Sequence, residues 1–150
     1  MNILAIDPGN IESAYCLIDK ESYKPIEFGK IDNNELIIKM EVLDYDFMAI
    51  EMIASYGMAV GASVFDTCVW IGRFIEKCET DYYYIYRKEE KINLCGSMKA
   101  KDSNIRQALI DRFGEVGIKK SPGFFYGFKK DIWSAYAVGV TYLDKIKKDK

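Results

Sequence analysis

The chain has 150 residues, of which 49% are hydrophobic and 29% charged, and its net charge is −2. This length allows one domain with a substantial core, so we expect residues 1–150 to form a single domain. The sequence contains no histidine, which excludes Ser-His and Cys-His nucleophiles and the usual zinc sites.

The first half of the chain is predicted to consist mainly of strands. Residues 2–7 are a short apolar run, which indicates a buried strand. The segments Ser13 to Ile18 and Ile26 to Ile31 are apolar-rich and are joined by a turn-like cluster, so the first three strands are expected to form an antiparallel meander. A short helix is predicted for Asn33 to Val42, followed by a fourth strand from Phe47 to Met52.

The second half is predicted to alternate between helices and a strand. The first expected segments are a helix at Met58 to Cys78, a strand at Tyr82 to Tyr86 and a loop at Ile92 to Ser97. They are followed by a helix that Asp102 or Ser103 could cap and that runs to Phe113, a glycine-rich aromatic loop at Ser121 to Phe128, and a helix at Asp131 to Ile146. A meander followed by strands that alternate with helices predicts an α/β fold with a mixed sheet and helices on its faces.

Three acidic residues occupy unusual places in this pattern. Asp7 ends the first strand just before a Pro-Gly turn, and Glu51 lies in an apolar strand. Asp131 begins the last helix, where the helix dipole alone would explain an aspartate. A buried carboxylate is costly unless it is paired or bound to a cation. Together the three acids predict a site of oxygen ligands for Mg²⁺ or Mn²⁺, which could support phosphodiester hydrolysis without histidine.

The charge is unevenly distributed along the chain. Residues 1–83 carry 6 Lys or Arg and 15 Asp or Glu, whereas residues 84–150 carry 15 and 8. A basic second half suggests a polyanion as partner. The lysines near the end of the chain are explained as a solvated tail. The candidates for phosphate contacts lie in the middle of the chain and are Lys88, Lys91, Lys99, Lys101 and Arg106.

The cellular compartment is predicted from the cysteines and the absence of apolar spans. The four cysteines form no C-x-x-C pair, so we expect reduced thiols rather than disulfides or a zinc site. No apolar stretch approaches the ~20 residues that span a bilayer, and no basic leader precedes the first apolar run. We therefore expect a cytoplasmic protein that has no membrane partner.

Several short motifs resemble, in their order, the RuvC-type Holliday-junction resolvases of the RNase H-like superfamily. The motifs are Ile6-Asp7-Pro8-Gly9, Ala14-Tyr15, Ala49-Ile50-Glu51, the basic segment Lys91-x-x-Leu94-x-Gly96-x-x-x-Ala100, and Asp131-x-x-Ser134-Ala135-x-Ala137. The short chain and the divergence of these motifs resemble a phage-encoded member, whose place would be the cytoplasm of the bacterial host.

The resemblance implies a fold, an activity and a set of site residues. The fold would be a central five-stranded mixed β-sheet flanked by α-helices. The protein would be a homodimer that cleaves branched DNA, such as four-way junctions, with Mg²⁺ or Mn²⁺. Carried over by position, Asp7, Glu51 and Asp131 would be the metal ligands and catalytic residues, and the long helix after Met58 would lie near the dimer interface.

The chain departs from the family pattern at three positions. A second acid usually follows three residues after the position of Asp131, but here that residue is Ser134. The family often has a lysine at the position of Asp102, for which Lys101 is the nearest substitute. It also commonly has an aromatic residue soon after the strand-four glutamate, and Tyr56 is the nearest candidate for such a DNA contact.

Three alternatives remain open at this point. An RNA-processing nuclease of the same superfamily would carry the same acids. A DNA-binding module that has lost its activity is suggested by Ser134. A plain structural protein would need a buried salt bridge to explain Glu51. An actin-like phosphotransferase is excluded by length, because that fold needs two such domains.

Overall fold

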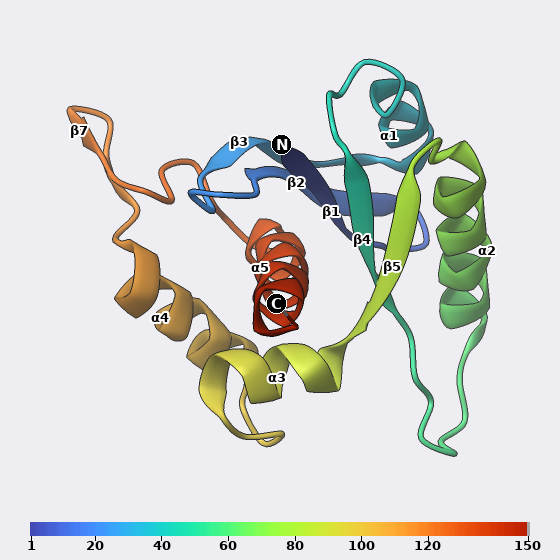
Figure 1. Ribbon diagram of the computed structural model, residues 1–150. Coiled ribbons are helices and arrows are strands. Elements are labelled where there is room, and N and C mark those ends of the chain that lie inside the picture. Colours follow the sequence, from blue (N-terminus) through green and yellow to red (C-terminus); the bar gives the residue numbers. More distant parts are fainter. Residues whose placement is uncertain (150) are drawn as a thin grey trace.

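Five strands form one central sheet in the computed structural model, which describes residues 1–149 (Figure 1). The strands are β1 Asn2–Asp7, β2 Glu12–Asp19, β3 Pro25–Asp32, β4 Phe47–Met52 and β5 Asp81–Tyr86. Their order across the sheet is β3-β2-β1-β4-β5. The first three strands pair antiparallel, and β4 and β5 are parallel to β1. The predicted five-stranded mixed sheet is therefore confirmed.

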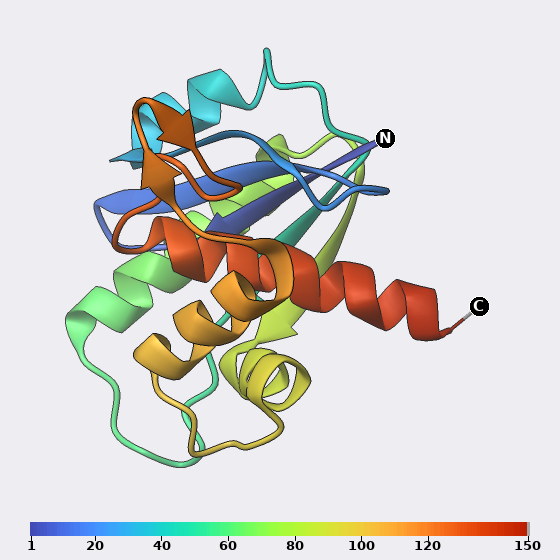
Figure 2. The same ribbon diagram turned by 90° about the vertical axis from the view of Figure 1, so that its left-hand side faces the viewer.

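Helices cover both faces of this sheet (Figures 1 and 2). The helices are α1 Asn33–Lys39, α2 Ala62–Lys77, α3 Arg87–Cys95, α4 Asp102–Phe113 and α5 Ile132–Lys148, and a small hairpin pairs β6 Gly117–Ile118 with β7 Ser121–Pro122. Helices α1 and α2 pack on one face, while α5 packs on the other with α3 and α4 beside it. No helix within residues 1–149 is long and apolar enough to cross a membrane.

The central strand β1 explains why the first apolar run is continuous rather than alternating. Ile3, Leu4, Ala5 and Ile6 are all fully buried, because their side chains enter the cores on both faces of the sheet. A strand covered on both faces favours an unbroken apolar sequence. Asp7 is the first residue of β1 beyond this run, so the strand delivers its carboxylate to the edge of the core.

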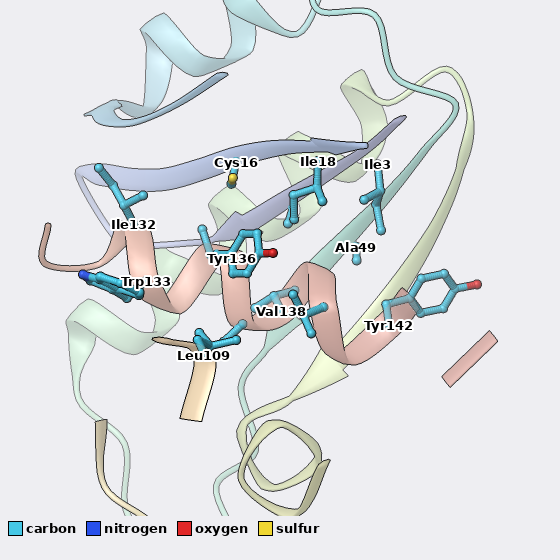
Figure 3. Close-up of a cluster of buried hydrophobic side chains, with 14 of the residues drawn as sticks. Ile3, Cys16, Ile18, Ala49, Leu109, Ile132, Trp133, Tyr136, Val138 and Tyr142 are labelled. Atoms are coloured by element: carbon cyan, nitrogen blue, oxygen red, sulfur yellow. The ribbon is translucent and has the colours of Figure 1, made fainter. Parts of the chain in front are cut away.

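Helix α5 lies unusually close to the sheet at Gly139. Figure 3 shows Tyr136 of this helix below Cys16 and Ile18 of β2, while Val138 lies on the lower side of the helix, towards Leu109 of α4. A β-carbon at position 139 would lie 2.3 Å from Ile18 Cδ1 and 3.0 Å from Ala5 Cβ. Only glycine allows this approach without displacing neighbouring side chains.

We expect Gly139→Ala to destabilise the protein by about 1–3 kcal/mol, the usual cost of overpacking a core. The matched control is Gly72→Ala, since Gly72 also lies inside a helix but has no atom within 4 Å of the β-carbon position. That control should be stabilised by about 0.5–1 kcal/mol. Urea denaturation of both variants measures the difference, and equal stabilities would contradict the close packing of α5.

Two local predictions are wrong. The expected loop at Ile92 to Ser97 is mostly the second half of α3, which ends where Gly96 adopts φ 70°. The helix was missed because it has no apolar stripe: Glu90 is its only buried residue. The helix expected from Met58 begins at Ala62 instead, so residues 58–61 belong to the loop after β4.

The start of α4 also differs from the expectation that Asp102 or Ser103 caps it. The residue before the helix is Lys101, whose backbone N–H donates to Asn104 Oδ1 at 2.9 Å. Asp102 instead forms an ion pair with Arg87 of α3. Asp102 therefore connects α4 to α3 through this ion pair and does not cap α4.

Candidate functional site

Asp7 and Glu51 lie at the same edge of the sheet. Strands β1 and β4 are parallel neighbours, with Ile6 opposite Ile50. The next residue of each strand is an acid, and neighbouring strands are about 4.8 Å apart. The topology thus brings together two carboxyl groups that are 44 positions apart in the sequence.

A buried polar network fixes the turn that follows Asp7. The Gly9 N–H donates to Ser13 Oγ at 3.0 Å, and the Ser13 hydroxyl donates to Asn33 Oδ1 at 2.6 Å. The Asn33 side-chain amide donates a hydrogen bond to the Gly9 carbonyl oxygen at 2.9 Å. A side chain at Gly9 would also collide with the Glu12 carbonyl, 2.2 Å away. This tight turn leaves the Asp7 carboxyl at the mouth of a cleft.

Asp131 joins this cleft from the start of α5. A cavity of about 320 Å³ is lined by Asp7, Gly9, Lys30 and Asp131 together with neighbouring residues of the turn. Asp131 is the N-cap residue of α5, but its side chain makes no capping hydrogen bond. It is instead 2.7 Å from Lys30 Nζ. Helix capping therefore does not account for this aspartate.

The electrostatics of Asp7 link the three acids. Burial, the charge of Glu51 and the charge of Asp131 together raise the pKa of Asp7 from 3.8 to about 8, against the opposing effect of Arg87 and Lys30. Such a shift means that the folded protein resists placing a negative charge on Asp7 unless positive charge is nearby. The structure thus brings Asp7, Glu51 and Asp131 into one electrostatic unit.

Glu90 of α3 is a fourth acid at this site, and the sequence interpretation missed it. Its side chain is fully buried, and its Oε1 accepts a hydrogen bond from Arg87 Nη1 at 3.3 Å. Burial raises the pKa of Glu90 well above its ordinary value, and Glu51 raises it further, both by its charge and because a proton on Glu90 can be donated to it. The surrounding sequence is polar, so no signal distinguished Glu90 from a solvated helix residue.

The chemistry of this site fits a hard divalent cation. All the acidic donors are oxygens, which Mg²⁺ and Mn²⁺ prefer. Two buried carboxyl oxygens, Glu51 Oε2 and Glu90 Oε2, have no hydrogen-bond partner among the described residues. Within residues 1–149, however, no three or more His, Cys, Asp or Glu side chains are already arranged to hold a metal ion. Lys30 and Arg87 contact two of the acids instead.

The predicted DNA contacts are only partly gathered around the acids. Tyr56, Lys88 and Lys91 line a cleft of about 220 Å³ with Arg87 and Met98. Arg106 lines a second cleft, of about 150 Å³, whose other residues include Arg87, Asp131 and Ser134. Arg87 thus links these two clefts, and Asp131 links the second one to the cleft of Asp7.

The two remaining predicted contacts lie apart from these clefts. Lys99 is in the loop between α3 and α4, and Lys101 directly precedes α4. Both side chains are exposed, and neither lines the three clefts named above. The sequence interpretation missed Arg87 and Lys130, two further cations that line the cleft of Arg106.

Comparisons with known proteins identify structural neighbours only. No protein-family model and no curated protein sequence matches the chain. The Thermus thermophilus RuvC structure is similar over 99% of this chain and 97% of its own, with a TM-score of 0.70 and 15% identity. T. thermophilus RuvC in complex with a Holliday junction substrate is similar over 99% and 96%, with a TM-score of 0.74 and 11% identity.

A third neighbour is more distant. The yeast mitochondrial Holliday junction resolvase is similar over 97% of this chain and 82% of its own, with a TM-score of 0.56 and 12% identity. At these identities the likeness concerns the fold. The chain therefore has the RNase H-like fold of RuvC, with a five-stranded mixed sheet flanked by helices.

Proposed function

We propose that this protein is a divalent-cation-dependent endonuclease that cleaves branched DNA, with four-way junctions as its substrate. The observation that carries the proposal is the meeting of Asp7, Glu51 and Asp131 at one edge of the sheet. A structural neighbour with the same fold is a RuvC bound to a Holliday junction substrate, which supports branched DNA as the ligand.

The acids supply the cation site in this proposal. Asp7, Glu51 and Asp131 would hold Mg²⁺ or Mn²⁺, which activates water and stabilises charge on the leaving oxygen of a phosphodiester. The turn fixed by Ser13 and Asn33 keeps Asp7 in position. Lys30 orients the Asp131 carboxylate through their ion pair.

The basic side chains hold the DNA backbone in this proposal. Lys88 and Lys91 share a cleft with Tyr56, whose exposed ring is suited to stacking on an unpaired base. Arg106 lies closer to the acids, in the cleft that Asp131 also lines. Lys99 and Lys101 are exposed and free to reach more distant phosphates.

We expect the double variant Lys88→Ala and Lys91→Ala to bind a four-way junction more weakly and with a shallower salt dependence. Each phosphate contact contributes about 0.9 to the slope of log K against log salt, so losing both should reduce the slope by nearly two. Lys24→Ala is the control, because this exposed lysine lies in the turn between β2 and β3. That turn follows the end of β2 that pairs with Asn2, whereas Asp7 pairs near the other end of the strand. Equal slopes for the wild type and the double variant would remove these lysines from the interface.

A homodimer is part of the proposal, since two sites related by a two-fold axis match a four-way junction. Helix α2 supports it with an exposed apolar stripe: Phe65 and Val69 are one turn apart and 61% and 62% exposed. Sedimentation of the wild type and of a Phe65→Glu, Val69→Glu variant tests this surface. The proposal expects a dimer that the double substitution converts to a monomer.

Cleavage of a labelled four-way DNA junction tests the proposed function. The assay compares Mg²⁺, Mn²⁺ and EDTA, beside matched linear duplex and an RNA duplex. Paired nicks at the DNA junction that disappear with EDTA are the expected result. Cation-dependent cutting of RNA alone would favour the RNA-processing alternative, whereas junction binding without cutting would favour the inactive module.

A further inference from the structure

Glu90 lies deeper in the protein than any other acid of the site. It sits in the first turn of α3, directly after the edge strand β5, and is fully buried. One of its oxygens contacts Arg87, while the other, Oε2, has no hydrogen-bond partner among the described residues. Glu51 Oε2 is in the same condition, and the two carboxyl groups lie within hydrogen-bonding reach of each other.

Fold stability does not explain this arrangement. Among the described residues, the other buried polar side chains Ser13, Asn33 and Thr67 have hydrogen-bond partners, and the Thr141 hydroxyl, which is uncharged, is the exception. When both are ionised, burying one carboxyl group beside another adds charge repulsion to the cost of desolvation. Arg87 does not require Glu90 as its partner either, because it already pairs with the exposed Asp102.

The balance of charge at the site points to a cation. The four acids Asp7, Glu51, Glu90 and Asp131 are contacted by two cationic side chains, Lys30 and Arg87. When all four are ionised, at least two negative charges remain uncompensated, because Arg87 is shared with Asp102. One divalent cation would supply two positive charges there, and the two orphaned oxygens could serve as its ligands.

We infer that Glu90 is a fourth acidic residue of the cation site, where its carboxylate binds together with that of Glu51. This inference rests on the proposed function and deepens it, because it identifies which acid replaces the one missing at position 134. Ser134 offers only a hydroxyl in the cleft beside Asp131. Glu90 supplies the carboxylate from α3, whereas Ser134 belongs to α5, and it lies beside Glu51 rather than beside Asp131.

The test is Mn²⁺ binding to the DNA-free protein, measured by calorimetry for the wild type and for Glu90→Gln. Glutamine keeps the volume and can still donate a hydrogen bond to Glu51, so we expect the variant to remain folded in EDTA. Its Mn²⁺ affinity should fall by about 10- to 100-fold, the usual effect of removing a group that ligates or orients at a metal site. Ser134→Ala should bind Mn²⁺ as the wild type does.

Glu51→Gln separates the failure of this inference from that of the proposed function. One outcome is that the wild type binds Mn²⁺, Glu51→Gln does not bind it, and Glu90→Gln binds it with full affinity. In that case the assignment of Glu90 is wrong and the cation site stands. If the wild type binds no Mn²⁺, both proposals fail.

A measurement on the wild type covers the case in which Glu90→Gln does not fold. A crystal of the wild type with Mn²⁺ should show the ion about 2.0–2.2 Å from carboxylate oxygens of both Glu51 and Glu90. An ion that contacts Glu51 but not Glu90 would overturn the inference.

Discussion

Asp7→Asn is expected to reduce cutting of a four-way junction by about three orders of magnitude, because a bound cation contributes several kcal/mol to catalysis. Asparagine has nearly the same shape but lacks the charge that binds the cation. Asp7 occupies the centre of the site, at the end of β1 and in the same cleft as Asp131. Junction affinity should be retained, since the basic residues are unchanged.

The control for this experiment is Asp44→Asn, the same chemical change at an exposed residue just before β4. This end of β4 is remote from Glu51, which lies near the other end of the strand. Cleavage rates and junction affinities of the three proteins are measured with Mg²⁺. Undiminished cutting by Asp7→Asn would show that the catalytic site lies elsewhere.

The second large effect concerns stability and pH. In EDTA we expect the wild type to lose stability as the pH rises from about 4 to about 8. Burial, Glu51 and Asp131 raise the pKa of Asp7 from 3.8 to about 8, so the folded state holds a proton there that the unfolded state releases. The stability associated with this proton is present below the unfolded pKa and lost as the pH rises through the folded pKa.

The magnitude follows from the size of the shift in the pKa of Asp7, which corresponds to about 6 kcal/mol at most. Asp7→Asn removes this titration and should therefore be more stable than the wild type at pH 8, with a smaller difference at pH 5. Urea denaturation in EDTA at both pH values measures the effect. Addition of Mg²⁺ at pH 8 should stabilise the wild type and leave Asp7→Asn unchanged. Parallel pH profiles for the two proteins would contradict the raised pKa of Asp7.

The placement of the candidate site could be predicted in part because strand-end acids leave a clear sequence pattern. Asp7 and Glu51 follow apolar runs whose length matches a buried strand, so their place at the edge of the core was readable. Their proximity depends on the parallel pairing of β1 with β4, which the ordered motifs suggested and the sheet topology establishes.

Glu90 and Arg87 could not be found in this way. Both belong to a run of charged residues at the start of α3, a pattern typical of a solvated helix. Their environment is created by long-range packing, since α3 contacts α4 and α5 after the chain leaves β5. The absence of an apolar stripe also hid the second half of α3, although Gly96 is a C-terminal signal that could have indicated a helix.

The basic surface was predicted from the charge of the second half, but its arrangement was not. Charge counting selects Lys99 and Lys101 as readily as Lys91, although only Lys91 lines a cleft beside Arg87. Charge counting also overlooks Lys30, which belongs to the acidic half of the chain but forms an ion pair with Asp131. The side chains that meet at the site are thus decided by the sheet order.

The position of Mn²⁺ in a crystal of the wild-type protein is the most direct test of the proposed acidic site. Anomalous scattering identifies the ion without reference to any assumed chemistry. We predict a peak at about 2.0–2.2 Å from carboxylate oxygens of both Asp7 and Glu51, the distance usual for such small divalent ions. A crystal that binds Mn²⁺ elsewhere, with no peak beside these two acids, would contradict the cation site on which the proposed nuclease activity depends.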